Sequence, residues 1–254
     1  MTIKEINDLI ESDYHNESIN EVNDGWFPLM KYDEEYGFKR SLEGIKAISI
    51  GLNPSLTNEF AKHIHHDILG IEKQFDFKSQ LKYGQERYDH YVRNKSNVTK
   101  KLVEYQSKLK YDIQNQIPYF NHLSLFFNEI DPEINFKDHV FHYDFCQLRH
   151  TDSKDMTNLM IKKYDTFVKH LKLVIDVINP ELIFIFNASL ARLLKDNDFF
   201  TSQTLDKEKG CYFLKHNLQS KTKIILANQL SGGATSTVYR DLIVWNVQRI
   251  LNTF

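Results

Sequence analysis

The chain has 254 residues, of which 41% are hydrophobic and 26% are charged, a composition typical of a folded globular protein. Its formal net charge of −2 argues against a protein that coats nucleic acid by charge alone. With only two cysteines, Cys146 and Cys211, the chain cannot form a disulfide-rich scaffold or a four-cysteine zinc or iron–sulfur site. The sequence contains no run of eighteen apolar residues, so it predicts no membrane-spanning helix.

The N-terminal part of the chain is strongly acidic. Residues 1–45 contain eleven acidic side chains and four basic ones. Residues 1–21 are acidic and polar, the opposite of a signal or transit peptide. We therefore expect a cytoplasmic protein with an acidic N-terminal arm over about residues 1–45.

The first predicted strand covers Lys46–Gly51, a short apolar run that reads KAISIG. It leads into the turn Gly51-Leu52-Asn53-Pro54-Ser55, where glycine and proline restrict the backbone. Asn53 directly follows the strand end, although an Asn-Pro pair taken alone is only a turn signal.

A basic stretch follows within a helical insertion that we place at about residues 60–135. Residues 73–110 contain ten Lys or Arg side chains and four acidic ones. The aromatic residues interleaved with them are Phe75, Phe77, Tyr83, Tyr88, Tyr91 and Tyr105. Basic side chains can bind phosphates and aromatic faces can stack on bases, so the stretch is typical of a nucleic-acid surface. A solvated helical face with its aromatic residues in the core explains the pattern equally well.

Three more apolar runs predict strands, at His139–Asp144, Glu181–Phe186 and Lys223–Ala227. Apolar residues at three-and-four spacing predict a helix from Met156 to Ile178, which Asn179-Pro180 ends.

Two shorter helices follow the last two strands. They are predicted at Leu190–Leu194 and Val238–Leu251. Apolar strands that alternate with helices indicate an α/β protein with a parallel sheet covered on both faces. In such sheets ligands bind beyond the carboxyl ends of the strands, so the residues that follow each strand are the candidate site.

The segments at these strand ends resemble the uracil-DNA glycosylase superfamily, most closely its mismatch-specific (thymine-DNA glycosylase) and single-strand-selective branches. The family's first motif, Gly-Ile/Met-Asn-Pro-Gly, is similar to Gly51–Ser55 except in its last residue. Asn179–Leu194 looks like a common strand-and-helix element of the family, with Asn187 in place of the usual glycine. Ile224–Ser236 occupies the second catalytic motif, where Asn228 matches and Gln229 and Leu230 depart before Ser231-Gly232.

The resemblance implies a three-layer α/β/α sandwich with a central four-stranded parallel sheet, in a single domain over residues 1–254. It implies hydrolysis of the N-glycosidic bond of a deaminated or damaged base flipped out of DNA. The partner would be single- or double-stranded DNA, with no membrane, and we expect a monomer. No metal and no organic cofactor are expected.

The family motifs assign roles to individual residues. Asn53 would orient the attacking water through its carbonyl, because Asn cannot take a proton near neutral pH. Asn228, Ser231 and the N–H groups of Gly232 and Gly233 would stabilise the leaving base anion. The remaining candidate substrate-binding residues are Gly51, Leu52, Pro54, Ser55, Phe60, Asp144, Asn187, Gln229 and Leu230.

Two of these residues have an alternative structural explanation. Leu230 is a candidate wedge for base flipping, since relatives insert an apolar side chain from this loop, or it packs beneath the loop. Phe60 is a candidate stacking residue, or it belongs to the core.

Asp144 is a departure from the family pattern, because several relatives have Asn there to meet both the N3–H and the O4 of uracil. An ionised Asp only accepts hydrogen bonds and would repel O4. Either Asp144 is protonated, or it points elsewhere, or the base is not uracil.

Two other functions are compatible with the sequence. The first is a catalytically weak or inactive superfamily member that binds nucleic acid or a nucleobase. The second is a metal-dependent hydrolase that uses His63, His65, His66 and Asp67, although adjacent histidines usually diverge around a helix or strand.

Overall fold

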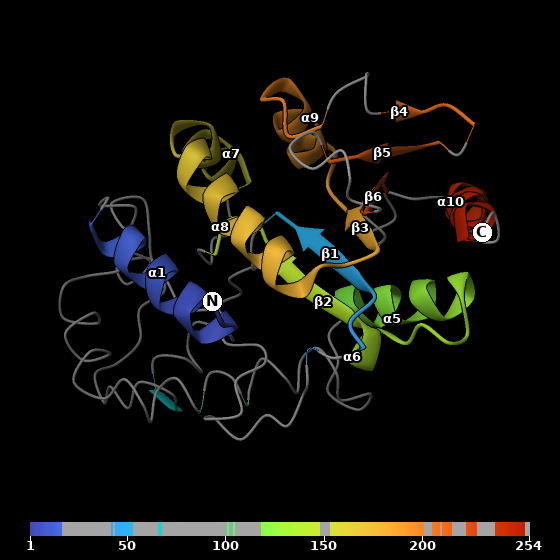
Figure 1. Ribbon diagram of the computed structural model, residues 1–254, viewed down its shortest axis with the longest axis horizontal. Helices are drawn as coiled ribbons and strands as arrows, with labels where there is room; N and C mark the ends of the chain where they lie inside the picture. The colour runs from blue at the N-terminus through green and yellow to red at the C-terminus, as the bar shows by residue number, and fades with distance from the viewer. Residues whose placement is uncertain are drawn as a thin grey trace. The chain divides into compact units, whose positions relative to one another are not determined.

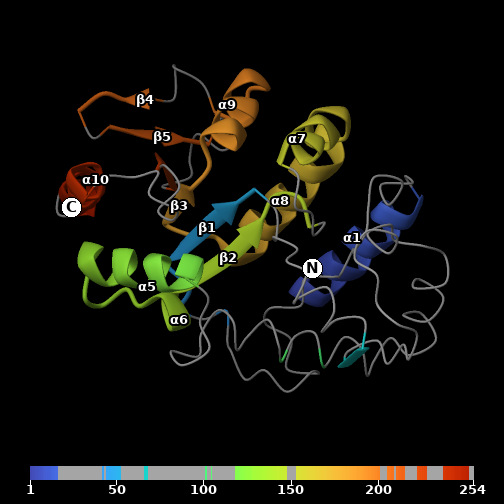
Figure 2. The same ribbon diagram turned by 180° about the vertical axis from the view of Figure 1, so that it is seen from behind.

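A computed structural model describes residues 1–16, 42, 44–52, 66–67, 101, 104, 118–147, 153–200, 205–208, 210–214, 222–227 and 237–251, and every structural statement below concerns these residues. Figures 1 and 2 show the chain from opposite sides. The chain divides into two compact units. Unit 1 comprises residues 1–41, 53–107 and 144–177, and unit 2 comprises residues 42–52, 108–143 and 178–254. The expectation of one domain over residues 1–254 stays a prediction.

A six-stranded sheet in the order β2-β1-β3-β6-β5-β4 belongs to unit 2, except for Asp144 at the end of β2, which is assigned to unit 1. The strands are β1 (Ala47–Gly51), β2 (Val140–Asp144), β3 (Leu182–Ile185), β4 (Leu205–Asp206), β5 (Cys211–Phe213) and β6 (Lys223–Leu226). β1 pairs with β3 and β3 pairs with β6 in parallel, whereas β6–β5 and β5–β4 are antiparallel. The predicted α/β class is therefore confirmed. The sheet is mixed and has six strands, where the sequence predicted four parallel ones.

The two additional strands escaped prediction because they are only two and three residues long. They form a hairpin whose turn is completed by Gly210 at φ +71°, a left-handed conformation that favours glycine. Arg249 donates hydrogen bonds to the carbonyl of Glu208 in this turn and to Oδ1 of Asn246, at 3.1 Å in the second case. The turn is thereby attached to the last helix of the chain.

The described helices of unit 2 are α5 (Pro118–Ile130), α6 (Phe136–His139), α9 (Ala188–Asp196) and α10 (Thr237–Leu251). Gln248 of α10 donates to the carbonyl of Glu129 in α5 at 2.9 Å, and Arg240 forms an ion pair with the Glu129 carboxylate. These polar contacts join α5 to α10 at the surface.

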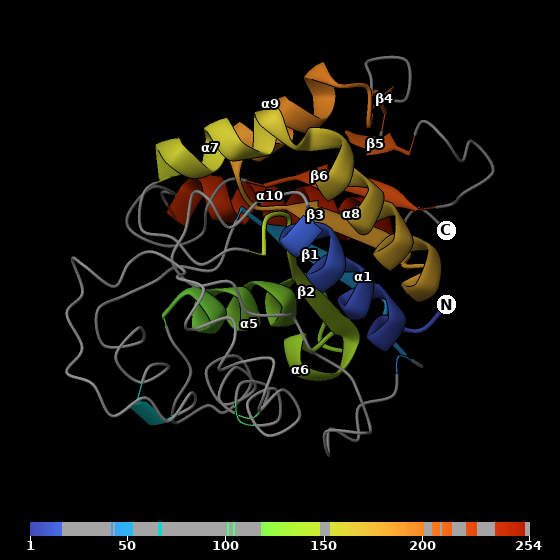
Figure 3. The ribbon, with the colours of Figure 1, turned by 90° about the vertical axis from the view of Figure 1, so that its left-hand side faces the viewer.

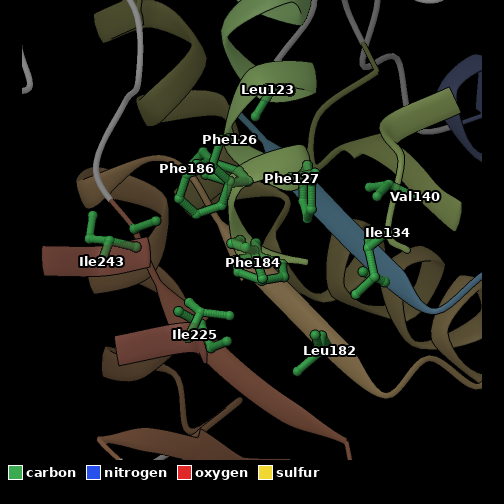
Figure 4. Close-up of a cluster of buried hydrophobic side chains, with 14 of the residues drawn as sticks. Leu123, Phe126, Phe127, Ile134, Val140, Leu182, Phe184, Phe186, Ile225 and Ile243 are labelled. Carbon is green, nitrogen blue, oxygen red and sulfur yellow. The ribbon is translucent and has the colours of Figure 1, made fainter. Parts of the chain in front are cut away.

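One apolar core fills the space between the sheet and the helices α5, α6 and α10. Phe126 and Phe127 of α5 contact Phe184 of β3 with ring centroids 5.8 and 5.1 Å apart and rings nearly perpendicular, and Phe186 lies against both (Figure 4). Each fully buried phenylalanine contributes about 1.5–3 kcal/mol, and edge-to-face pairs add about 0.5–1.5 kcal/mol each. This phenylalanine cluster therefore holds α5 on the sheet.

Unit 1 contains three described helices, α1 (Ile3–Asn16), α7 (Ser153–Lys162) and α8 (Tyr164–Ile178). The sequence predicted one helix over the last two segments. Backbone hydrogen bonds run from Lys163 N to Leu159 O and from Phe167 N to Lys163 O, so the helical bonding continues across the break (Figure 3). α8 ends as predicted at Asn179, which is left-handed with φ +48°, before Pro180.

α1 lies within the segment that was expected to be an acidic arm. Thr2 and Glu5 form a capping box, in which Thr2 Oγ1 accepts from Glu5 N at 3.2 Å and Thr2 N donates to Glu5 Oε2 at 2.7 Å. Ile3, Ile6 and Ile10 are at most 5% exposed and follow helical spacing. The arm therefore begins with an amphipathic helix whose apolar face is buried.

Candidate functional site

The carboxyl ends of three strands lie at the same edge of the sheet. Ile50, Ile185 and Leu226 are in register in β1, β3 and β6. The main chain stays paired beyond these positions, because Phe186 N donates to Ile50 O at 3.1 Å and Ala227 N donates to Ile185 O at 3.0 Å. Gly51 is buried and Leu52 is half-buried, and the chain leaves β1 at this point.

Most of the predicted site residues lie outside the described part of the chain. These are Asn53, Pro54, Ser55 and Phe60 after β1, and Asn228, Gln229, Leu230, Ser231 and Gly232 after β6. Their catalytic and substrate-binding roles stay predictions. The described part of the predicted site consists of Gly51, Leu52, Asp144 and Asn187.

Asp144 is the last residue of β2 and is only 6% exposed. Its backbone carbonyl accepts a hydrogen bond from Nε2 of Gln147, which is 1% exposed, so the chain turns tightly after the strand. A carboxylate at this position can only accept hydrogen bonds when it is ionised. Base reading by Asp144 therefore needs a donor group on the base or a proton on the carboxyl.

Asn187 follows β3 as predicted, and the structure gives it a clear local role. Its Oδ1 accepts a hydrogen bond from Leu190 N at 2.9 Å, and its backbone is extended, with φ −146° and ψ 122°. Asn187 is thus the N-cap of α9, a position where Asn is strongly preferred. Substrate binding by Asn187 stays a prediction, and any such contact has to be made while the side-chain oxygen accepts the hydrogen bond from Leu190 N.

The candidate metal ligands His63 and His65 lie outside the described residues, whereas His66 and Asp67 lie within them. The carbonyl of Asp67 accepts a hydrogen bond from Nζ of Lys101 at 3.1 Å. In the part of the chain that is described, no three His, Cys, Asp or Glu residues are grouped so as to hold a metal ion.

A polar pair that sequence reasoning missed lies between β1 and β2. Ser49 Oγ and His142 Nδ1 are 2.6 Å apart, and the two residues are 0% and 1% exposed. The sequence signal was available, because each is a polar residue inside a predicted apolar strand. What the sequence did not supply was the pairing of the two strands, which brings them together.

A second buried histidine occurs in unit 1. His170 of α8 is fully buried, and its Nε2 lies 2.8 Å from Oδ2 of Asp13 in α1, while Lys169 Nζ lies 3.1 Å from the same oxygen. Burial raises the pKa of Asp13, but hydrogen bonds from His170 and Lys169 outweigh it and hold the pKa below its ordinary value of 3.8. Asp13 is therefore an ionised carboxylate that ties α1 to α8.

Unit 2 also contains a cavity of about 240 Å³ between β5, β6 and α10. The lining residues are Gly210, Tyr212, Ile225, Leu226, Tyr239, Leu242, Ile243 and Asn246. No charged side chain belongs to this described lining, so the cavity does not have the chemistry of a phosphate site.

No protein-family model and no curated protein matches this chain. None of the described helices is long and apolar enough to cross a membrane. A function for this protein must therefore be argued from its own residues.

Proposed function

We propose that this protein is a monofunctional DNA glycosylase of the uracil-DNA glycosylase superfamily that acts in base-excision repair. Its substrate is a deaminated or damaged, uracil-like base in single- or double-stranded DNA, flipped out of the base stack. The protein is a cytoplasmic monomer and works without a metal ion or an organic cofactor.

The sequence predicted four strands, and the observation that carries this proposal is the order in which these strands lie in the sheet. β2, β1, β3 and β6 are consecutive neighbours in the sheet, and the segments with family-like residues follow these four strands. Two contacts between the first pair, Lys46 N to His139 O at 2.9 Å and Ser49 Oγ to His142 Nδ1, both join residues 93 positions apart. A constant offset is the pattern of parallel neighbours and supports a four-stranded parallel core within a three-layer α/β/α fold.

The reaction breaks the bond between C1′ of the deoxyribose and the base nitrogen, and the bonding electrons leave with the base. A water oxygen then forms the new bond to C1′ and loses its proton to solvent. Asn53 orients that water through its side-chain carbonyl. Asn228, Ser231 and the Gly232 and Gly233 N–H groups stabilise the charge on the departing base.

The test is incubation with oligonucleotides that carry uracil, hypoxanthine, xanthine or ethenocytosine, followed by alkaline cleavage at abasic sites. Asn53→Ala should lower the single-turnover rate by about 10²-fold or more, while binding to an abasic analogue changes far less. Asn53→Asp is the matched control, since a carboxylate can also accept a proton and should retain or raise the rate. If Asn53→Ala cleaves as fast as the natural sequence, this mechanism is wrong.

The buried Asp144 and the capping role of Asn187 favour a second candidate. Both stand at strand ends where the family reads its substrate, and both differ from the usual family residue. A catalytically weak or inactive member that binds nucleic acid or a nucleobase would tolerate these differences. It would bind the same oligonucleotides and leave no abasic sites in any of them.

A further inference from the structure

The cavity between β5, β6 and α10 has a size and a lining that suit a planar ring. Its volume is about 240 Å³, and an apolar cavity of about 150 Å³ already accepts a benzene ring. The described lining combines two tyrosines with four aliphatic residues, which are Tyr212, Tyr239, Ile225, Leu226, Leu242 and Ile243. The cavity therefore has room for one ring that carries exocyclic groups, in contact with aromatic and aliphatic residues.

Asn246 supplies an oriented hydrogen-bond donor to the same cavity. Arg249 Nη2 donates to Asn246 Oδ1 at 3.1 Å, and because a guanidinium only donates, the amide oxygen has to be the atom that faces it. The amide also lies against Gly210, another lining residue with φ +71°, since a Cβ there would stand 3.4 Å from both Oδ1 and Nδ2. The Nδ2 group of Asn246 is thus the end of the amide that can donate to a ligand.

The surface beside the cavity carries large apolar side chains. Tyr239, Leu242 and Trp245 of α10 are exposed and are spaced three residues apart, so they lie along one side of the helix. Tyr239 and Leu242 also line the cavity. Aromatic and aliphatic residues around a concavity, with a single well-placed polar group, are typical of a small-molecule binding site.

We propose that this cavity binds a nucleobase. The ring contacts the tyrosine and aliphatic residues of the lining, and a carbonyl oxygen or ring nitrogen at its edge accepts a hydrogen bond from Asn246 Nδ2. The lining defines the class as a planar ring with an acceptor at its edge, and the choice of a nucleobase within that class rests on the proposed function. No lining residue belongs to the catalytic or substrate-binding set predicted from sequence, so the site is additional to that set.

Nitrogen-15 NMR of the full chain tests the site directly and distinguishes a free nucleoside from a base in a DNA strand. The probes are thymidine, a single-stranded oligothymidylate and deoxyribose as the control without a base. The Asn246 side-chain NH₂ and the Gly210 N–H should shift in a saturable way with a probe that carries a base. A shift with the oligothymidylate alone would mean that the base binds as part of a strand. Equal shifts with deoxyribose, or no shift with either base-containing probe, would overturn the proposal.

A matched pair of variants tests the donor. Asn246→Asp keeps an oxygen for Arg249 but replaces the donor with an acceptor, so the affinity for the base-containing probe should fall by about tenfold or more. Asn135→Asp makes the same change outside the lining, where its oxygen can still accept from Asp138 N at the start of α6, and should leave the affinity unchanged. An Asn246→Asp variant that binds as tightly as the natural sequence contradicts the assigned donor.

Failure of this site and failure of the proposed function give different results. Binding at Asn246 with no abasic sites in any oligonucleotide would support the cavity and contradict base excision. Base excision without any shift at Asn246 and Gly210 would support the proposed function and overturn the cavity site. The NMR measurement uses the natural sequence, so it decides the proposal even if Asn246→Asp does not fold.

Discussion

Two histidines are buried in the part of the chain that the structure describes, and their described partners differ. His142 in unit 2 faces the hydroxyl of Ser49 and two aromatic rings, whereas His170 in unit 1 faces the carboxylate of Asp13, with Lys169 beside it. A hydroxyl suits a neutral imidazole, and a carboxylate suits a charged one. Burial alone therefore does not decide what a histidine contacts, because the described partner is a hydroxyl in one unit and a carboxylate in the other.

The largest expected effect concerns the aromatic cover of His142. Phe120 is 7% exposed and contacts the ring edge-on. Phe120→Ala should lower the free energy of unfolding by about 3–5 kcal/mol, because it removes a buried ring and leaves a cavity. Urea unfolding of the full chain measures this loss. Leu125→Ala, at a 45% exposed position of α5, is the control and should stay within about 0.5 kcal/mol.

Removing the charge from the partner of His170 should have an intermediate effect. Asp13→Asn keeps an oxygen acceptor for His170 but removes the negative charge, and we expect a loss of about 1–2 kcal/mol at pH 7. Urea unfolding at pH 7 gives this value. A stability equal to that of the natural sequence would mean that the carboxylate does not hold α1 on α8.

The acid limb of stability should also change in Asp13→Asn. The pKa of Asp13 is lowered in the folded state from its ordinary value of 3.8. The carboxylate therefore contributes its full share of the folding stability at pH values above the range in which Asp13 titrates in the unfolded chain. This contribution is lost as the pH falls through the lowered folded value. The difference in stability between the natural sequence and Asp13→Asn should therefore shrink on acidification from pH 5 to pH 2. A difference that stays constant over that range would contradict the assignment.

The smallest effect is expected at Lys169, whose side chain is 53% exposed. Lys169→Met keeps the aliphatic part of the side chain and removes its charge. An exposed ion pair contributes about 0–1 kcal/mol, so the loss should be less than about 0.5 kcal/mol and should disappear in 1 M salt. Unfolding curves at low and high salt measure it. A loss as large as that of Asp13→Asn would mean that Lys169, rather than His170, is the main partner of Asp13.

The apolar runs predicted the four longer strands to within one residue at every end, because continuous burial on both faces leaves a clear pattern. Helices also follow the last two predicted strands as expected, because Asn187 is a cap signal before α9 and apolar residues at helical spacing run through α10. α1 was missed, although its Thr2–Glu5 capping box and its isoleucine spacing were present in the sequence. The net acidity of residues 1–45 masks this periodicity in the sequence.

The candidate site was predicted less completely. Asn187 was located correctly at a strand end, yet a sequence motif does not show that its side-chain oxygen already caps a helix. Ser49 and His142 stand inside predicted strands, and only the pairing of β1 with β2 turns two isolated polar residues into a pair. Contacts between segments 93 positions apart leave no local signal, which is why this pair escaped prediction.

The antiparallel hairpin of β4 and β5 affects how easily two molecules of this protein can pair through the edges of their sheets. It puts β4, a strand of only two residues that includes Asp206, at the outer edge of the sheet, while every residue of the opposite edge strand β2 is buried. A long uncovered edge strand offers a row of backbone groups on which another chain can add a strand, and short, charged edges discourage this. The mixed sheet therefore protects this protein against edge-to-edge aggregation, which a parallel sheet ending at an uncovered β6 would invite.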